Sequence, residues 1–396
     1  MEKQQLNGLT EAVTEIKAYD EQNGYIRQDD TVGTIMTDGS SPKHNNRIIE
    51  IDQRCRIRKL TPRECWRLMG FDDTDYDKAA AVVSGNQLYK QRGNSIVVQV
   101  LENVFRQFTN KVEHRREEIT FYDAPFYVVD KPIRLIELFA GIGSQAKRME
   151  RLGLDFETYR VCEWDKYCIS SYNAIHGTDF GTSDITKLNG NDLGIVDTDK
   201  YCYVVTYSFP CQDLSLAGRQ AGMSKGEGTR SGLLWEVERL LNECNDLPQI
   251  LVMENVPQVH SKRNMGDFER WIEFLKSKGY SCFWRDLNAK NYGIPQNRNR
   301  CFMVSILGNY DYEFPYPVEL QLRLKDMLES QVDEKYYIPL EKIKIIEAWE
   351  KREKAKGNGY RWNLRSQNDI RSTVTTSSER YASTTYINED EYNDIK

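Results

Sequence analysis

A cysteine at the end of a short apolar run is the first candidate for a reactive side chain. The run Tyr203-Val204-Val205 lies within YCYVVTYSFPCQDLS (residues 201–215) and is typical of a buried strand. Pro210 has no N–H to donate, so the strand must end there and leave Cys211 at its carboxyl end. Open α/β sheets bind their ligands at that edge. A lone cysteine is more often a small buried thiol, so Cys211 needs partners elsewhere in the chain.

A carboxylate and two arginines could supply those partners. Glu254 follows the apolar stretch 250–253, where burial favours its protonated form and suits a general acid or a donor to a ring nitrogen. Arg298 and Arg300 stand two apart at the start of another strand and point to the same side, where their planar forks suit a carboxylate, a phosphate or a base carbonyl. Each has an ordinary structural reading, such as a capped helix start for Glu254, but their joint occurrence is hard to obtain by chance.

A glycine-rich turn between a strand and a helix predicts a site for a nucleoside-type cofactor. In FAGIG (139–143) the glycines allow close backbone approach, and the helix that follows presents unpaired N–H groups. Glu163 lies twenty residues beyond Gly143, where it could accept hydrogen bonds from ribose hydroxyls. Asp184-Ile185 could reach an adenine amino group, although an ordinary turn aspartate is the simpler reading. These residues fit a dinucleotide as well as S-adenosylmethionine, so they leave the cofactor's identity open.

Strands and helices alternate regularly from residue 132 to about residue 309, which predicts an α/β fold with a parallel, doubly wound sheet. The predicted strands are 134–139, 158–163, 202–208, 250–254, 280–288 and 300–307, and helices between them include 144–152, 233–243 and 268–278. Nearer the front, Thr61 and Glu64 predict a capping box that opens a helix. A turn at Gly93-Asn94 then leads into a predicted helix from Ser95 to Phe108. A helix is also expected at 340–356.

Composition indicates a globular protein with more than one domain. The chain has 396 residues, of which 39% are hydrophobic and 29% charged. It shows no membrane-length apolar run and no signal peptide, so we expect a cytoplasmic protein. Nine scattered cysteines without a CxxC pair favour reduced thiols, and the four histidines lack a ligand spacing with cysteine, which argues against structural zinc. The net charge of −6 gives no sign of nucleic acid, although one basic face can still bind phosphates.

In combination, these motifs resemble those of the DNA (cytosine-5) methyltransferase family over residues 54–108 and 132–307. The matching stretches are FAGIG, Glu163-Trp164, Ser183-Asp184-Ile185, SFPCQDLS, MENV, QNRNR, RKLTPREC, RLMGF and QLYKQRGNSIVV. Ser208 stands where the family usually has glycine, a small change beside Cys211. The motif order departs more. RKLTPREC and GNSIVV normally close such proteins but here precede FAGIG, which indicates a circular permutation.

The resemblance implies a Rossmann-like, S-adenosylmethionine-dependent methyltransferase fold with a smaller, irregular, β-rich target-recognition domain. The cofactor would be surrounded by Phe139, Ala140, Gly141, Gly143, Glu163, Trp164, Asp184, Ile185, Pro210, Asn94 and Ser95. The expected parts of the chain are a share of the recognition region (1–57), the motifs that usually end the family's chains (58–108), a connector (109–131), the catalytic and cofactor-binding domain (132–309), and the main recognition region with an acidic tail (310–396). In the family the last helix packs beside the first strand, and the connector is long enough to join them.

The reaction that the resemblance implies is methylation of carbon 5 of a cytosine in a specific short sequence of double-stranded DNA. Cys211 would add to carbon 6, and Glu254 would hold N3 and the exocyclic amine. Arg300 would bind the carbonyl oxygen, and Arg298 would orient Glu254 or a phosphate. Because a stacked base is out of reach, the cytosine must be flipped out of the duplex.

The resemblance also leaves partners and alternatives to test. We expect a monomer, with a cognate restriction endonuclease as the partner that the family suggests. One alternative is a tRNA cytosine-5 methyltransferase of the same family. Another is a dinucleotide-dependent oxidoreductase that uses Cys211, which would leave Glu254 and the two arginines without a role. The third is an inactive, DNA-binding relative. The presence of every expected catalytic residue argues against it.

Overall fold

The computed structural model describes much of the chain from residue 57 onward and three short strands before it. The described residues are 15–20, 25–26, 47–51, 57–109, 124–211, 214, 222–226, 230–357, 364–373 and 386–388. Most of the expected connector and the acidic tail lie outside these residues. Within them, no helix is both long and apolar enough to cross a membrane.

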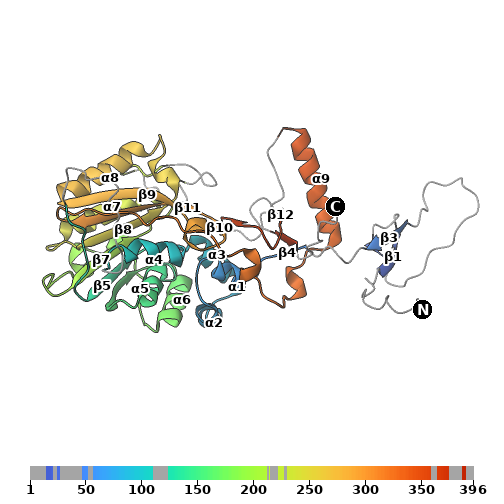
Figure 1. Cartoon of the computed structure of the whole chain (residues 1–396), viewed down its shortest axis with the longest axis horizontal. Helices are drawn as coiled ribbons and strands as arrows, with labels where there is room; N and C mark the ends of the chain where they lie inside the picture. The colour runs from blue at the N-terminus through green and yellow to red at the C-terminus, as the bar shows by residue number, and fades with distance from the viewer. Residues whose placement is uncertain are drawn as a thin grey trace, which may run out of the picture.

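A six-stranded sheet forms the centre of the larger body (Figure 1). In spatial order the strands are β6 (Phe156–Cys162), β5 (Ile133–Leu138), β7 (Cys202–Tyr207), β8 (Ile250–Asn255), β11 (Asn299–Leu307) and β9 (Tyr280–Asn288). The strands β6, β5, β7 and β8 are parallel to one another, but β11 is antiparallel to both β8 and β9. The segment 289–298 between β9 and β11 contains no helical crossover, which a parallel pairing would need. The expectation of a wholly parallel sheet is therefore wrong at this strand.

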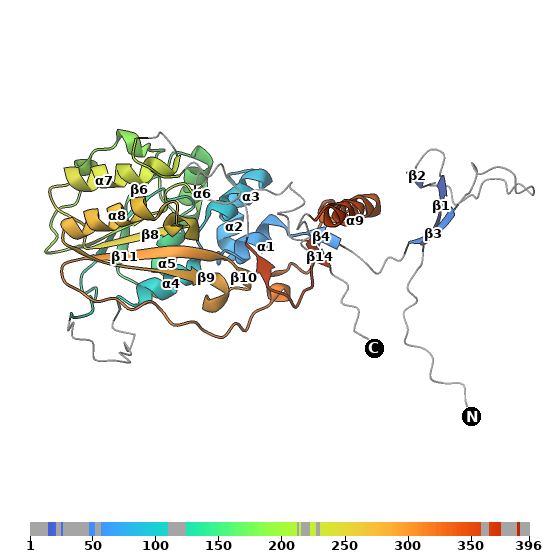
Figure 2. The ribbon, with the colours of Figure 1, turned by 90° about the horizontal axis from the view of Figure 1, so that it is seen from above.

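Helices cover both faces of the sheet, because successive side chains of each strand point to opposite faces. The helices are α4 (Val98–Arg106), α5 (Ser144–Leu152) and α6 (Lys166–His176) on one face, and α7 (Leu234–Glu243) and α8 (Met265–Ser277) on the other (Figures 1 and 2). Leu135 and Val204 belong to the core of the first face, and Ile136 and Val205 to that of the second. This three-layer α/β/α arrangement is the expected Rossmann-like methyltransferase fold.

Three short helices join the central sheet to the smaller sheets. They are α1 (Pro62–Arg67), α2 (Asp73–Ala80) and α3 (Gly85–Asn94). The predicted capping box opens α1, since the Thr61 hydroxyl accepts from the Glu64 N–H and the Glu64 carboxylate accepts from the Thr61 N–H. The turn predicted at Gly93-Asn94 is instead the end of α3. The next helix begins only at Val98, because Ser95 and Val97 have extended backbones.

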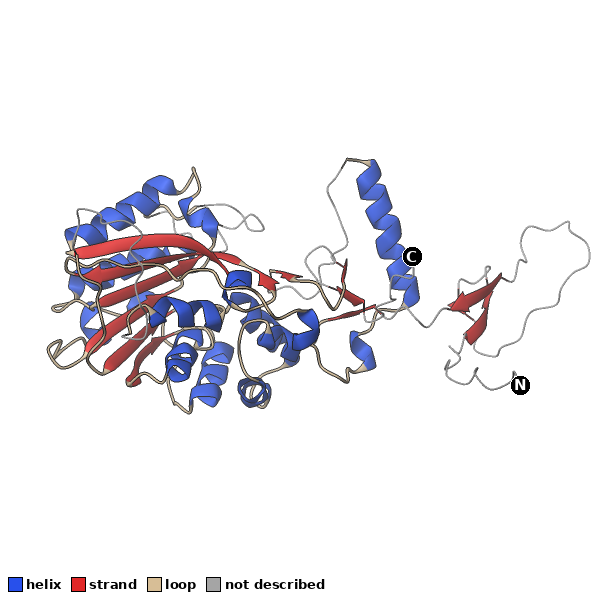
Figure 3. Ribbon diagram, viewed as in Figure 1, coloured by secondary structure: helices blue, strands red, loops and turns tan. Residues whose placement is uncertain are grey.

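The last part of the chain returns to its front. A small sheet has the order β12 (Leu364–Arg365), β14 (Tyr386–Asn388) and β4 (Ile57–Lys59), so the last described strand pairs with the start of the described stretch 57–109 (Figure 3). A second small pair joins β10 (Gln296–Asn297) to β13 (Arg371–Ser372). The helix predicted at 340–356 is α9 (Leu340–Ala355). A separate antiparallel sheet contains β1 (Glu15–Asp20), β2 (Tyr25–Ile26) and β3 (Arg47–Ile51).

Candidate active site

One pocket at the carboxyl edge of the sheet gathers most of the side chains that the sequence singled out. The predicted catalytic residues that line it are Cys211, Glu254, Arg298 and Arg300, and the predicted cofactor residues are Phe139, Ala140, Gly141, Glu163, Trp164, Pro210, Asn94 and Ser95. Three predicted cofactor residues do not line the pocket, namely Gly143, Asp184 and Ile185. The pocket therefore brings the expected nucleophile and the expected cofactor turn into one space.

The glycine turn uses its two glycines differently. Gly141 and Gly143 both have left-handed backbones, with φ of +60° and +81°. A Cβ at Gly143 would lie 2.2 Å from His176 Nε2 on α6, so this glycine is required by packing beneath the turn. A Cβ at Gly141 would meet no heavy atom within 4 Å, so its glycine keeps space free on the pocket side. His176 Nε2 lies 3.2 Å from the Ile142 carbonyl oxygen and contacts the turn from below.

Glu163 ties the glycine turn to the end of β6. Its carboxylate oxygens accept hydrogen bonds from the Gly141 N–H at 2.9 Å and the Asp165 N–H at 2.8 Å. Burial raises the pKa of Glu163, and these backbone hydrogen bonds oppose the rise. Trp164, next in the chain, is 81% exposed and offers an open aromatic face. A carboxylate acceptor, a flat ring and a glycine without a Cβ in the way together fit a nucleoside-type cofactor.

Asp184 and Ile185 do not line this pocket, although the Ser183 N–H donates to the Glu163 carbonyl oxygen at 2.8 Å. Asp184 is exposed, and its Oδ1 accepts from the N–H and the hydroxyl of Thr186 at 3.0 and 2.8 Å. These hydrogen bonds lower the pKa of Asp184. Ile185 is buried in the core on the α7 and α8 face of the sheet. In this structure Asp184 has the contacts of an ordinary turn aspartate.

The backbone before Cys211 is fixed by two side chains that the sequence analysis did not identify. Asn255 Nδ2 donates to the Phe209 carbonyl oxygen at 2.9 Å, and Ser231 Oγ donates to that of Pro210 at 2.6 Å. Asn255 is buried and stands directly after Glu254 in MENV, so its position beside a candidate carboxylate was the available signal. Ser231 follows the Cys211 motif at a distance and carries no such signal.

Glu254 and Arg300 form an ion pair beside Cys211. Glu254 Oε1 lies 3.1 Å from Arg300 Nε, and both side chains are largely buried. Burial raises the pKa of Glu254, against the lowering effect of Arg300 and Arg298. Burial and the Glu254 charge also raise the pKa of the Cys211 thiol, while the two arginines lower it. The protein alone therefore holds Cys211 as a thiol at neutral pH.

Arg298 fixes the end of α3 against the active site. Its Nη2 donates to the carbonyl oxygens of Gly93 at 3.1 Å and Ser95 at 2.8 Å. Burial and the charge of Arg300 lower the pKa of Arg298 to about 9, which leaves it protonated at neutral pH. Arg298 thus positions the wall of the pocket that contains Asn94 and Ser95, and its charge acts on Glu254 without an ion pair.

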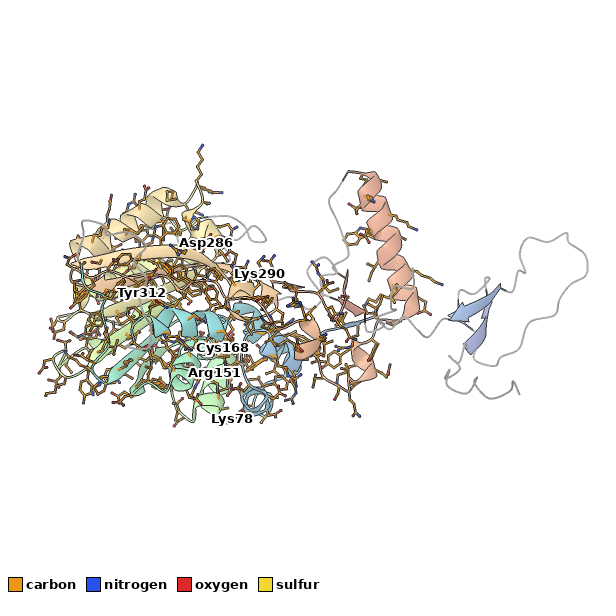
Figure 4. All side chains as sticks on the ribbon, in the orientation of Figure 1. Lys78, Arg151, Cys168, Asp286, Lys290 and Tyr312 are labelled. Atoms are coloured by element: carbon orange, nitrogen blue, oxygen red, sulfur yellow. The ribbon has the colours of Figure 1, made fainter. Side chains whose placement is uncertain are left out.

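Other pocket residues were also missed by the sequence analysis. They are Lys90, Gly93, Ile96, Ile142, Ser144, Gln145, Asp165, Cys168 (labelled in Figure 4), Ser208, Phe209, Asn255 and Val256. Lys90 Nζ lies 2.7 Å from Asp165 Oδ2, and Ser95 Oγ lies 2.7 Å from Ser144 Oγ. Both contacts join the 58–108 segment to the cofactor side of the pocket. The motif QLYKQRGNSIVV contains Lys90 and Ser95, but nothing in its spacing shows which residues they meet.

Comparison with known proteins gives consistent matches. A family model described as C-5 cytosine-specific DNA methylase matches residues 2–110 and 133–395. The Type II methyltransferase M2.ScrFI of Lactococcus lactis subsp. cremoris is 34% identical over 254 residues, covering 52% of this chain and 70% of that protein. The orphan methyltransferase M.SssI of Spiroplasma monobiae is 34% identical over 259 residues, covering 52% and 67%. The structure of the Entamoeba histolytica methyltransferase EhMeth shares the fold, with a TM-score of 0.54 and 18% identity over 67% of this chain and 79% of that one.

Proposed function

Because the chain belongs to the C-5 cytosine-specific DNA methylase family and is a DNA cytosine-5 methyltransferase, we propose that it methylates a flipped-out cytosine in a specific short sequence of double-stranded DNA. The methyl donor would be S-adenosylmethionine, since the family and the fold imply a reaction that depends on it. The observation that carries the proposal is the meeting of Cys211, the Glu254–Arg300 pair and the Gly141–Glu163 contact in one pocket.

The glycine turn and the end of β6 would hold the cofactor. Glu163 would accept hydrogen bonds from the ribose hydroxyls of the cofactor, and the Trp164 ring would contact the base of the cofactor. The space at Gly141 would admit the cofactor close to the backbone. Asn94 and Ser95 would close the opposite wall, where Arg298 holds them. When bound, S-adenosylmethionine supplies an electrophilic methyl group.

Cys211 would make carbon 5 of the cytosine reactive by adding to carbon 6. Glu254, whose pKa is raised by burial, would donate a proton to N3 of the base and make carbon 6 more electrophilic. The Cys211 thiol must lose its proton to the Glu254 carboxylate or to solvent as the base binds, because the thiol form is favoured beforehand. Arg300 lies beside Glu254 and would bind the carbonyl oxygen of the base. After methyl transfer, the carbon 5 proton would leave to solvent, and the electrons of that bond would restore the ring double bond and release Cys211.

A split recognition region and a permuted chain order also belong to this proposal. We assign residues 310–396 and about 1–57 to target recognition, supported by the pairing of β14 with β4, which begins at Ile57. The Val129 N–H donates to the Phe108 carbonyl oxygen at 2.9 Å, so the two sides of the connector are neighbours. This neighbourhood supports a circular permutation in which the connector joins ends that are free in the family's usual order.

Nucleic acid specificity is the direct test of this function. We expect the purified protein to transfer label from methyl-labelled S-adenosylmethionine to double-stranded DNA and not to tRNA. Bisulfite sequencing of DNA from cells that express the protein should then show one short methylated sequence. Label in tRNA alone would favour the tRNA methyltransferase, and tight nicotinamide dinucleotide binding with no methyl transfer would favour the oxidoreductase.

The Glu163→Ala substitution should weaken S-adenosylmethionine binding by roughly 10- to 100-fold. The change removes a charged acceptor and also the two hydrogen bonds that shape the turn, and hydrogen bonds to charged groups contribute about 1.5–3 kcal/mol each. Isothermal titration calorimetry measures the effect. Glu157→Ala is the matched control, because Glu157 lies on β6, the strand that leads to Glu163, but is exposed and pairs with Arg134. Equal affinity in all three proteins would contradict the assignment of Glu163.

The oligomeric state, the location and the partners of the protein belong to the same proposal. We propose that the protein acts as a monomer in the cytoplasm. Type II relatives such as M2.ScrFI suggest a cognate restriction endonuclease, whereas M.SssI is named an orphan and suggests a solitary enzyme. Challenge of the methylated DNA with extracts of the source cells separates these two, because only a cognate endonuclease would cut the unmethylated sequence selectively.

A further inference from the structure

Three side chains with metal-binding atoms converge beside the active site. They are His260, from the turn Pro257–His260 after β8, Asp286 on β9 and Cys301 on β11. One ring nitrogen, one carboxylate oxygen and the sulfur all lie within 4.8 Å of one another. Figure 4 labels Asp286 near the end of β9 that leads to β10. Nothing in the proposed methyl transfer uses this cluster.

The surrounding elements hold the three side chains in place. Cys301 and Asp286 are direct partners in the antiparallel register of β11 and β9, so their side chains share one face of the sheet. His260 Nε2 lies 2.9 Å from Asp286 Oδ1. The His260 ring packs on the Trp284 ring, with centroids 4.7 Å apart and planes at 35°. Trp284 lies two residues before Asp286 on the same face of β9, so it holds the imidazole over the strand.

Two features of the cluster are compatible with ligand roles for its side chains. Aspartate is disfavoured within a β-strand, yet Asp286 stands inside β9. Cys301 is fully buried with a free thiol, and none of the hydrogen bonds among the described residues involves its sulfur. The His260 and Asp286 side chains remain 21% and 30% exposed, so a solvent-borne ion can approach from their side while Cys301 closes the inner side.

We propose that His260, Asp286 and Cys301 form a binding site for a divalent transition metal of the zinc class. Nitrogen, oxygen and sulfur are the donor atoms that zinc takes, and three protein ligands would leave the fourth position to water. Metal–ligand bonds of about 2.0–2.3 Å set tetrahedral donor atoms roughly 3.3–3.8 Å apart, so small side-chain rotations suffice. On binding, the Cys301 thiol becomes a thiolate and its proton leaves to solvent. Magnesium and calcium prefer all-oxygen sites and should not bind here.

The site would brace the catalytic edge of the sheet. Cys301 also pairs in register with Asn255 on β8, and Asn255 holds the Phe209 carbonyl just before Cys211. A metal at the cluster would connect β11, β9 and the turn after β8 through bonds that form only in the folded protein. Such binding stabilises the folded state, so the melting temperature should rise with zinc concentration.

Cobalt(II) is the probe that tests the site, because a thiolate ligand gives it an intense near-ultraviolet charge-transfer band. The experiment uses the full-length Cys211→Ser protein, which removes the thiol of the proposed active site. We expect one equivalent of Co²⁺ to produce the band and one equivalent of Zn²⁺ to displace it. Zn²⁺ should also raise the melting temperature of this protein, and Mg²⁺ should not.

Substitutions decide whether this cluster is responsible. Adding Cys301→Ser should remove the band, whereas Cys282→Ser, which changes a half-buried thiol on the same face of β9, should leave it unchanged. His260→Gln should weaken Co²⁺ affinity at least tenfold with an unaltered circular dichroism spectrum, which keeps the test decisive if Cys301→Ser fails to fold. Absence of the band in the Cys211→Ser protein, or an unchanged affinity in the His260→Gln variant, would overturn the proposal.

Discussion

Replacing Cys211 with alanine should abolish methyl transfer, with a loss of at least about 10⁴-fold, while the protein stays folded. Removal of a covalent nucleophile typically lowers the catalytic rate by a factor of this order or larger. The Cys211 side chain is only partly buried at the margin of the core, so truncation should cost no more than about 1 kcal/mol of stability. Label transfer to duplex DNA measures the activity, and circular dichroism with thermal melting measures the fold.

A covalent trap separates loss of the nucleophile from loss of binding. Duplex DNA with 5-fluorocytosine at the target cannot lose a proton from carbon 5, so the wild-type protein should accumulate an adduct that survives denaturation. The Cys211→Ala protein should form none. Cys244→Ala is the matched control, because Cys244 is another half-buried thiol, at the end of α7 and outside the pocket. Substantial methyl transfer by Cys211→Ala, or no adduct with the wild-type protein, would contradict the mechanism.

Replacing Glu64 with alanine should destabilise the protein by about 3–5 kcal/mol, the cost of leaving one partner of a buried ion pair behind. Both Glu64 and Arg58 are fully buried, and two hydrogen bonds of 2.8 Å join them. Glu64 also accepts the backbone N–H groups of Thr61 and Glu329. The substitution therefore removes the carboxylate that pairs with a buried guanidinium and a connection between α1 and the 310–396 segment.

Urea denaturation with parallel limited proteolysis would measure this loss. Glu102→Ala serves as the control, because Glu102 pairs with Arg106 one turn away on the surface of α4, and such pairs contribute less than about 1 kcal/mol. If Glu64→Ala were no more destabilising than Glu102→Ala, the Arg58 pair would not be a structural anchor. Arg63 and Arg67 also form ion pairs within the protein, as Arg58 does. The result therefore also bears on the structural role of the arginines near residue 60.

The active-site residues that the sequence predicted depend on local patterns. Pro210 predicted the end of a buried strand, which the structure places at Tyr207, and this local pattern predicted Cys211 at the sheet edge. The same holds for Glu254 near the end of β8, and for Gly141, whose free space is a consequence of its turn. Such patterns can be recognised from the sequence because each depends only on residues that are neighbours in the chain.

Contacts between distant segments were not predictable in the same way. The carbonyl groups that Arg298 binds are about 200 residues away in the sequence, so the motif QNRNR could not reveal its positioning role. His260, Asp286 and Cys301 have no recognisable ligand spacing, and the spacing of histidines and cysteines led us to expect no zinc site. Asp286 and Cys301 meet through the register of β9 with β11, and His260 reaches them from the turn after β8. The role predicted for Asp184 stays a prediction; its place after a strand did not reveal that its Oδ1 accepts from Thr186.

The reversed direction of β11 explains how residues from opposite ends of two strands come to share a site. In a sheet whose strands all run one way, residues that begin a strand lie a full strand length from residues that end one. Arg300 begins β11, and Glu254 lies near the end of β8. Because β11 runs against β8, its entrance falls beside the exit of β8, and the 3.1 Å ion pair can form. The reversal of this one strand thus places the start of β11 and the end of β8 at the same edge of the sheet, where both can contribute side chains to one pocket.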